Sequence, residues 1–574
     1  MPPPSYCASY SSLPYKGELS LEEIFQNSQI PQAICPTTGL SISTPFNAKE
    51  WALHLVAAKY PSPAAASTLV KCLRVGVDLG FRGDRSRTQI GPNLVSANDN
   101  AAAIETNITA ELDLGRRKGP FPKPPFNYFY SNPLGVVFKK GKSKPRVIHH
   151  LSWPRTTENN SVNASIINFD VNLGAFDQAV KHVREAGKNC FFSKIDVESA
   201  YRCIPVRPED WPLLGFSWGD KFYFDAVMQF GITSATAIFE WYSSAAQYIA
   251  EKLLHLPYLV HYVDDFFNIS TNLTDSKFHL EAIVKLFAKL GIPVSPKKLE
   301  GPAKTMIFLG ILFDSVSMTL RLDEEKLASI HKELDDWSQR TSATKDEILS
   351  LIGALSFASK VVPPGRTFLR RMIDHTKTLP STTEQYPLSE SFLHDVQWWR
   401  QFMTQWNGVA VIPDVDWTPA HALQVHTDAC VKGYAGIFGS HWFACEWTTE
   451  EEALAHRSKR DSMPFKELYA LARAAATWGH LWKGRKILFN TDCQPNVLAW
   501  RKGDSKHPQI SHLLRTLLFL AAKHDFNMNI VHIPGVVNVG ADLLSRGQIT
   551  RFLDLPGLHD PSPTTPLPLP TQTW

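Results

Sequence analysis

Two adjacent acidic residues at the tip of an apolar hairpin are the strongest chemical signal in this sequence. Asp264 and Asp265 end the segment Tyr-Val-Asp-Asp, which begins at Tyr262 and lies between two short apolar stretches. This pattern predicts a β-hairpin with carboxylates at its turn. Adjacent carboxylates repel each other, and a divalent cation such as Mg²⁺ is the commonest reason to hold them together. A lone match is more often an exposed acidic turn, so its meaning depends on neighbouring motifs.

A second predicted strand supplies another carboxylate. Residues 191–196 alternate in a period of two and end at Asp196, as expected for a strand with an acid at its end. Asp196 and the hairpin could share two metal ions about 3.5–4 Å apart, an arrangement that activates an attacking hydroxyl and stabilises a leaving pyrophosphate. We therefore expect Asp196 and Asp264 to be metal ligands, supported by Asp265.

Three more motifs accompany these acids. Residues 133–152 predict two strands around a Lys-rich turn that contains Lys139 and precedes Arg146. Phe230 and Gly231 form a glycine turn before a predicted helix. Lys297 and Lys298 follow, ahead of a Phe-Leu-Gly segment at residues 308–310.

The ordered set resembles the reverse transcriptase family. The resemblance implies a polymerase with fingers, palm and thumb that uses Mg²⁺ or Mn²⁺, two ions in each active site. It implies substrate-binding roles for Lys139, Arg146, Tyr201, Phe230, Gly231 and Lys298. Lys139 is favoured over Lys140 for the triphosphate by its spacing from Arg146, and Lys298 is preferred over Lys297 as a general acid. Tyr201 fits a gate against the ribose 2′-hydroxyl and a core tyrosine equally well.

A second acidic set follows near the carboxyl end. Asp428 and Asp492 each end a predicted strand, while Glu467 and Asp542 lie near the starts of predicted helices. This order resembles the ribonuclease H fold, and it implies that these four residues are catalytic metal ligands. Four clustered acids without partners would be costly, so metals are expected if the acids converge. The ribonuclease H family usually has a histidine in a loop before the last acid. Here His532 is predicted to end a strand, so that loop histidine is missing. Its absence favours slow turnover of RNA cleavage or an inactive domain kept as a scaffold.

Together the two resemblances imply RNA-directed DNA synthesis with removal of the RNA strand. The expected partners are an RNA template, a DNA primer, an RNA–DNA hybrid and deoxynucleoside triphosphates. The main alternative is a decayed or domesticated retroelement protein that binds the hybrid without catalysis. His149 and His150 stand where gypsy-like elements usually show an acidic residue and a tyrosine, so the sequence resembles the DIRS-like retrotransposons more closely. A recombinase or integrase is then expected to be encoded separately, and the His-x-x-Arg match at His512 and Arg515 is interpreted as chance.

Composition is that of a globular intracellular protein. The chain has 574 residues, 44% of them hydrophobic and 20% charged, and its net charge is +4. Its eight cysteines show no paired spacing, which argues against a disulfide framework or zinc site. No apolar run is long enough for a membrane span, so we expect a cytoplasmic or nuclear protein without membrane contact.

The expected fold class is multidomain α/β, a right-hand polymerase followed by a ribonuclease H-like α/β domain. The thumb should carry an apolar stripe that ends at Leu334 and Trp337, and a capping box from Thr344 to Glu347. The Pro-rich tail should be extended and mobile. The predicted boundaries are 1–105 for an unassigned, mostly helical region, 106–316 for fingers and palm, 317–380 for a helical thumb, 381–420 for a connection, 421–550 for the ribonuclease H-like domain and 551–574 for the tail.

Overall fold

The chain folds into two compact units. The computed structural model describes residues 21–138, 145–155, 160–169, 171, 174–362, 365–405, 409–411, 422–456, 462–503, 505, 507–524, 526–556 and 561–570. The first unit comprises Met1–Leu309 and Asp314–Ser317, and the second comprises Gly310–Phe313 and Met318–Trp574. The chain passes from one to the other around β12 (Thr305–Phe308) and β13 (Ile311–Asp314).

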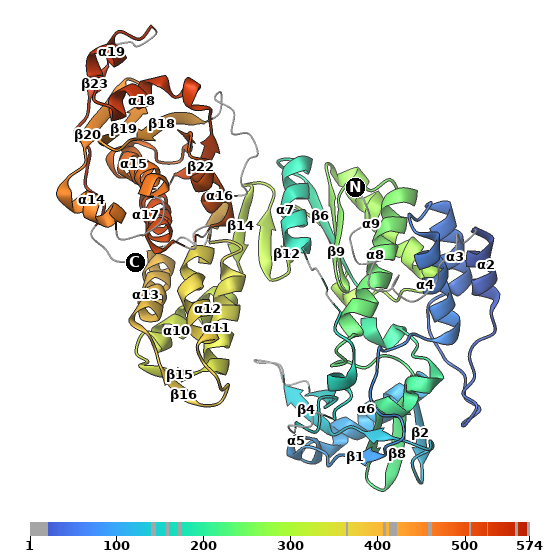
Figure 1. Ribbon diagram of the computed structural model, residues 1–574. Coiled ribbons are helices and arrows are strands. Elements are labelled where there is room, and N and C mark those ends of the chain that lie inside the picture. Colours follow the sequence, from blue (N-terminus) through green and yellow to red (C-terminus); the bar gives the residue numbers. More distant parts are fainter. Residues whose placement is uncertain are drawn as a thin grey trace. The chain divides into compact units, whose positions relative to one another are not determined.

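The first unit contains a four-stranded antiparallel sheet with the strand order β11-β6-β10-β9 (Figure 1). Its strands are β6 (Phe191–Asp196), β9 (Leu259–Tyr262), β10 (Asp265–Ser270) and β11 (Glu300–Ala303). The helices packed on it are α7 (Ala175–Ala186), α8 (Ala235–Leu253) and α9 (Leu273–Leu290). Asn272 begins α9 by accepting a hydrogen bond from the Asp275 amide, and Gly291 ends it in the left-handed conformation. The predicted strands at Asp196 and around the acidic turn are confirmed.

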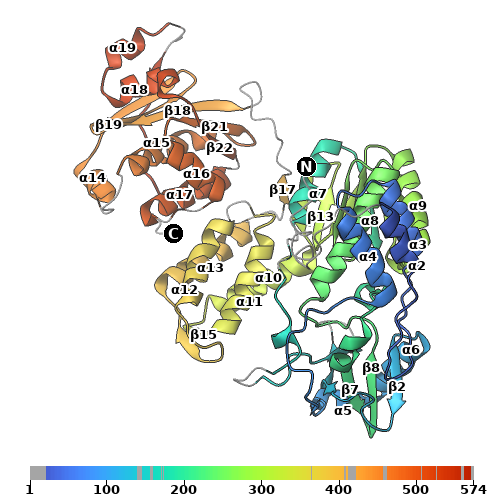
Figure 2. The same cartoon turned by 45° about the vertical axis from the view of Figure 1, so that its right-hand side comes forward.

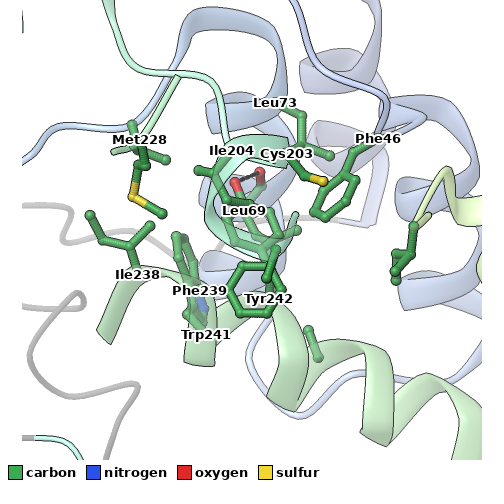
Figure 3. Packing of buried hydrophobic residues seen from close by; sticks show 14 of the residues in the cluster. Phe46, Leu69, Leu73, Cys203, Ile204, Met228, Ile238, Phe239, Trp241 and Tyr242 are labelled. Atoms are coloured by element: carbon green, nitrogen blue, oxygen red, sulfur yellow. Dashed lines mark hydrogen bonds between the residues drawn. The ribbon is translucent and has the colours of Figure 1, made fainter. Parts of the chain in front are cut away.

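The N-terminal helices share the core of this sheet. They are α2 (Leu21–Gln29), α3 (Ala48–Ala57) and α4 (Pro63–Val75). Figure 3 shows Leu69 and Leu73 of α4 packed beside Ile204 and Tyr242, and the Tyr242 hydroxyl donates to the Leu69 carbonyl at 3.2 Å. Pro63 opens α4 at a position where a missing amide costs nothing. Helices α3 and α4 lie on either side of residues 58–62, and both pack in the core beside the sheet.

A second, smaller core supports a five-stranded sheet in the same unit. The strand order is β1-β3-β7-β8-β2, and a separate hairpin pairs β4 with β5. The strands are β1 (Gln89–Ile90), β2 (Arg117–Phe121), β3 (Tyr130–Ser131), β4 (Leu134–Phe138), β5 (Pro145–His149), β7 (Gly215–Trp218) and β8 (Lys221–Asp225). The helices α5 (Val95–Asn98) and α6 (Ala101–Asp113) complete this part, where Ile104 packs with Leu134 and Phe216. The predicted pair of strands around the Lys-rich turn is therefore confirmed.

The second unit begins with a helical segment. Its helices are α10 (Glu324–Trp337), α11 (Lys345–Ala358), α12 (Arg370–Lys377) and α13 (Glu390–Gln405), with paired strands β14 (Thr319–Leu322) and β17 (Val409–Val411), and β15 (Ser342–Thr344) and β16 (Gln385–Pro387). Leu334 and Trp337 are buried as the predicted stripe requires. Thr344 and Glu347 form the predicted capping box at the start of α11.

A six-stranded sheet forms the rest of the second unit, with the order β22-β21-β18-β19-β20-β23. Its strands are β18 (Leu423–Ala429), β19 (Gly433–Phe438), β20 (His441–Glu446), β21 (Lys486–Thr491), β22 (Asn527–His532) and β23 (Ser562–Pro563). The accompanying helices, visible in Figure 2, are α14 (Thr449–His456), α15 (Ser462–Trp478), α16 (Gln494–Lys502), α17 (Pro508–His524), α18 (Val539–Ser545) and α19 (Ile549–Leu553). The first three strands are an antiparallel meander, as predicted, and β21 joins β18 in parallel.

Buried polar contacts join the helical segment to this sheet domain. Arg515 of α17 donates to Asp395 of α13 at 3.2 Å and to the Thr367 carbonyl at 2.9 Å. The two charged side chains are 3% and 0% exposed, so they are held in protein rather than in water. The Thr367 hydroxyl donates to the Gly503 carbonyl at 2.9 Å. Arg515 thus has a structural partner, which agrees with the interpretation of the His-x-x-Arg match as chance.

The prediction of a mobile Pro-rich tail was wrong for residues 561–570. In the structure β23 pairs with β20, Arg473 donates to the Pro566 carbonyl at 3.3 Å and the Leu567 amide donates to Thr477. Leu569 packs against the domain core. Prolines lose little conformational entropy on ordering and keep their carbonyl acceptors, so an extended Pro-rich segment can still dock on a surface.

Two further features concern the cysteines and the hydrophobicity of the helices. The seven cysteines in the described part of the chain are free. Among the described residues, no helix is long and apolar enough to cross a membrane.

Candidate active sites

Strand register brings the first set of acids together. Asp265 lies opposite Asp196 across β10 and β6, and opposite Tyr262 across β10 and β9. The chain therefore reverses through Val263 and Asp264, which places Asp264 at the same end of the sheet. Val197, the residue after Asp196, donates its backbone N–H to the Asp264 carbonyl at 3.0 Å. This hydrogen bond holds the turn against the end of β6.

The turn between β9 and β10 is strained. Val263 has a φ of 55°, a left-handed conformation that is a genuine outlier for a β-branched residue. The Ser243 hydroxyl of α8 donates to the Val263 carbonyl at 2.6 Å. Strain of this kind persists only where surrounding contacts determine the backbone, and it concentrates at functional sites.

The carboxylates affect one another electrostatically. Burial, with repulsion from Asp264 and Asp196, raises the pKa of Asp265 to about 6. Burial also raises the pKa of Asp264, with Asp196 adding to the shift. Positive charge is therefore favoured at this end of the sheet.

Lys298 supplies positive charge at the same place. Its Nζ atom lies 2.8 Å from both carboxylate oxygens of Asp196. That hydrogen bond raises the pKa of Lys298. The structure thus places Lys298, the preferred lysine, at the acids.

The remaining residues predicted to bind substrate lie on several elements of the first unit. Tyr201 is half-buried, its hydroxyl lies 3.0 Å from that of Thr236, and its ring centroid is 5.2 Å from that of Phe230. Phe230 is 56% exposed, and Gly231 has a φ of 95°, which only glycine adopts easily. Arg146 on β5 is exposed and pairs with Val137. Lys139 and Lys140 lie outside the described residues.

A second acidic cluster forms in the six-stranded domain. Asp428 at the end of β18, Glu467 on α15 and Asp492 after β21 present carboxylate oxygens within 4.8 Å of one another. Asp428 and Glu467 are buried, whereas Asp492 is exposed. One oxygen of Glu467 accepts from the Ala429 amide at 3.3 Å, and the other is buried without a hydrogen-bond partner. An all-carboxylate donor set with an unsatisfied buried oxygen suits a hard cation such as Mg²⁺ or Mn²⁺.

The pKa values of the carboxyls in this cluster also favour a bound cation. Burial, with repulsion from Asp428 and Asp492, raises the pKa of Glu467 to about 9. Burial raises the pKa of Asp428 to about 6, and Asp492 and Asp542 add to the shift. The cluster is thus unfavourable for ionised carboxylates until a cation compensates them.

Asp542, the fourth predicted ligand, lies beside the cluster rather than within it. Its carboxylate is paired with Arg546 at 2.7 Å on the surface of α18. Such an exposed pair contributes little energy, so it would not prevent Asp542 from turning towards a metal. Asn538 precedes α18 as predicted, but its side chain donates to the Thr427 carbonyl at 2.9 Å instead of capping the helix.

Two groups near these sites were missed by sequence reasoning. The Ser545 hydroxyl donates to Asp428 at 2.5 Å, and nothing in its sequence context indicates this. Asp225 is fully buried between two arginines in the first unit. The available signal was an acid inside the apolar run Phe-Tyr-Phe-Asp-Ala-Val-Met, since a buried charge needs a partner.

A comparison with protein families finds a match for residues 137–313, most of which lie in the first unit. Residues 137–313 match the family model described as "Reverse transcriptase (RNA-dependent DNA polymerase)". The chain contains a reverse transcriptase domain. This domain carries Asp196, Asp264 and Asp265, and the expected mixed α/β class, a polymerase followed by another domain, is confirmed.

Curated relatives of the reverse transcriptase domain are polyproteins of viruses and transposons. Polyprotein P3 of Commelina yellow mottle virus is 22% identical over 377 residues, covering 63% of this chain and 18% of the viral protein. The Transposon Tf2-3 polyprotein of Schizosaccharomyces pombe is 23% identical, covering 62% and 25%. The Enzymatic polyprotein of Carnation etched ring virus is 25% identical, covering 67% and 54%. The chain thus spans between about a fifth and a half of the length of these relatives.

Among solved structures, the foamy viral protease-reverse transcriptase in complex with dsDNA is similar to this chain. It is 13% identical and has a TM-score of 0.47, over 91% of this chain and 98% of the foamy viral chain. The same foamy viral protein in complex with an RNA/DNA hybrid is 14% identical, has a TM-score of 0.46 and covers 93% of this chain and 66% of its own.

Proposed function

We propose that this chain is an RNA-directed DNA polymerase with ribonuclease H activity, derived from a retroelement polyprotein. The observation that carries the polymerase is the convergence of Asp196, Asp264 and Asp265 on paired strands within a reverse transcriptase domain. The observation that carries the nuclease is the cluster of Asp428, Glu467 and Asp492. Together these favour synthesis of DNA on an RNA template, because a ribonuclease H activity is useful only where a hybrid is made.

The residues of the first site have separate roles in this proposal. Asp196 and Asp264 would hold two Mg²⁺ or Mn²⁺ ions, which supply activation of the primer 3′-hydroxyl and neutralisation of the leaving pyrophosphate. Arg146, together with Lys139, binds the triphosphate, since a guanidinium can donate to two phosphate oxygens at once. Lys298 donates a proton to the pyrophosphate from Nζ. Tyr201 stands against the ribose 2′-hydroxyl.

The second site is proposed to cleave the RNA strand. Asp428, Glu467, Asp492 and Asp542 would hold the ions that supply an activated water molecule. Asp542 would exchange Arg546 for the metal. Asp492 is exposed, so it is accessible to a hybrid. Glu467 and Asp428 are buried, so they would hold the metal from the inner side of the site.

A DIRS-like origin is the finer part of the proposal. It is supported by His149 and His150, which replace the acidic residue and tyrosine of gypsy-like elements. A separately encoded recombinase or integrase would then be needed for insertion of the DNA product.

Primer extension on a 5′-labelled RNA template tests both activities in the same tubes. Asp196→Asn should abolish extension and leave RNA cleavage intact, whereas Asp492→Asn should do the reverse. Each variant thus serves as the folding control of the other. The absence of extension by the wild-type protein with Mg²⁺ or Mn²⁺, despite binding of the hybrid, would replace the proposal with a non-catalytic hybrid-binding protein.

A further inference from the structure

A buried charged cluster forms around the end of β8 in the first unit. The carboxylate of Asp225, at the end of β8, is 0% exposed. It accepts from Arg117 Nε at 2.8 Å, from Arg202 Nη1 at 2.7 Å and from Gln229 Nε2 at 2.9 Å. Three elements that are distant in sequence thus meet at one side chain.

The charges of the cluster are balanced, and its members are joined by directed hydrogen bonds. Arg202 also donates to Glu111 at 2.6 Å, so two arginines face two carboxylates. Arg117 lies 3.2 Å from His149 Nε2, and burial lowers the pKa of His149 to about 3. A neutral ring can accept the arginine N–H at Nε2, which joins β5 to the same cluster.

Buried ion pairs of this kind are weak evidence for stability. Replacing them by apolar side chains is often neutral or stabilising, whereas removing one member is costly. Their fixed hydrogen-bond geometry does define the relative positions of the elements they join. The identity of the joined elements therefore decides what the cluster is for.

The partners of Asp225 are sequence neighbours of the predicted nucleotide-binding residues. Arg202 directly follows Tyr201, and Gln229 directly precedes Phe230. The rings of Tyr201 and Phe230 contact each other, with centroids 5.2 Å apart. A single carboxylate thus holds both backbones from which this aromatic pair projects.

We propose that Asp225 is a positioning residue that sets the Tyr201–Phe230 pair, and thereby determines how strictly the polymerase selects deoxynucleotides over ribonucleotides. This inference rests on the proposed function. Asp225 acts through Arg202 on one ring and through Gln229 on the other, without touching the substrate. A displacement of about 1 Å at a reacting or recognising group can cost on the order of a hundredfold, so small shifts of the two rings should be measurable.

The chain offers a matched control for Asp225. Asp210 is also 0% exposed and is also held by two arginines. It accepts from Arg207 Nε at 3.0 Å and from Arg85 Nη2 at 2.5 Å. Neither arginine is a sequence neighbour of Tyr201 or Phe230, so Asp210→Asn should not reach the aromatic pair. Arg85 and Arg207 are 32% and 29% exposed, whereas Arg117 and Arg202 are buried, so we expect Asp210→Asn to destabilise the fold less than Asp225→Asn does.

The experiment compares incorporation of deoxynucleotides and ribonucleotides by the full chain. For Asp225→Asn we expect the kcat/KM for the deoxynucleotide divided by that for the ribonucleotide to fall by about tenfold or more. The change should come mainly from a lower KM for the ribonucleotide, because a displaced Tyr201 no longer excludes the 2′-hydroxyl. Asp210→Asn should keep the wild-type ratio. Equal loss of selectivity in both variants, or in neither, would overturn the proposal. Gln229→Met, which removes one hydrogen bond without removing a charge, should lower selectivity to a smaller extent if Asp225→Asn does not fold.

Amide hydrogen exchange separates failure of this inference from failure of the proposed function. Asp225→Asn should increase exchange in residues 200–203 and 228–231 relative to Asp210→Asn. That increase in exchange would support the positioning role even if the wild-type protein extended no primer. Absence of extension by the wild-type protein would reject the proposed polymerase activity but not the positioning role. Unchanged exchange in both segments would reject the positioning role whatever the activity.

Discussion

Several acids in both sites are buried, so their ionised forms destabilise the folded protein. Asp265 and Asp428 have pKa values of about 6, and Glu467 has one of about 9, in each case chiefly because of burial. A carboxyl whose pKa is raised in the native state binds more protons there than in the unfolded chain. Its contribution to stability therefore falls as the pH rises between the two values.

The first prediction concerns pH and metal removal. In a chelator, the free energy of unfolding should fall as the pH rises from about 4 through about 6, and further towards about 9 because of Glu467. Added Mg²⁺ should reduce this slope, since the ion stabilises the ionised carboxylates. Urea denaturation at several pH values measures both effects. A metal-free stability that rose with pH across this interval would contradict the prediction.

Glu467→Gln provides the second prediction. With a pKa of about 9, the Glu467 carboxyl is protonated in the folded, metal-free protein at neutral pH, whereas it is ionised in the unfolded chain. The neutral glutamine removes the cost of this protonation, so the substitution should stabilise the metal-free protein by on the order of 1–3 kcal/mol at neutral pH. It should also abolish RNA cleavage while primer extension continues. Thermal denaturation in chelator and the labelled-template assay test the two parts. Destabilisation with retained cleavage would show that Glu467 is a structural residue.

Among the secondary-structure elements, the turn between β9 and β10 is the most constrained. The Val263 conformation is unfavourable by itself, and the hydrogen bond from Ser243 is one of the contacts that hold it. Catalytic geometry in the first site thus depends on helix α8 as well as on the strands.

Ser243→Ala tests this dependence. Loss of a buried hydrogen bond should cost about 1–2 kcal/mol of stability, and primer extension should fall because Asp264 is no longer held in place. RNA cleavage should be unchanged. Ser193→Ala is a control, because its hydroxyl is buried in β6 but bonds to Ser276 rather than to the turn. Equal losses of extension in both variants would argue against a specific effect on the turn.

The elements around the sites could largely be predicted from sequence, whereas their tertiary partners could not. Alternating apolar residues that end in an acid identified the strands at Asp196, Asp264 and Asp428, since period and polarity are local properties. The two arginine partners of Asp225 lie 108 and 23 residues away, so no local pattern reveals them. The docking of the tail was missed for the same reason: composition describes an isolated segment and not the surface that receives it.

At the scale of the whole molecule, the second unit depends on a buried ion pair. Arg515→Met would leave Asp395 fully buried with Arg371, at 3.6 Å, as its remaining arginine partner among the described residues. We expect the second unit to lose about 3–5 kcal/mol of stability. The double variant Asp395→Leu, Arg515→Met should recover much of it, because the uncompensated charge is gone. Chemical denaturation of the three proteins measures this, and a double variant no better than the single one would contradict the explanation.

The same ion pair affects which fragments of the chain should fold stably. A fragment that ended at residue 405 would keep Asp395 but lose its arginine, and with it the contacts of Thr367. A fragment that began near residue 318 would retain both partners. Exchange of the C-terminal sheet domain between related proteins should therefore succeed more often when the α10–α13 helices are transferred with it, because these helices carry the partners of Arg515.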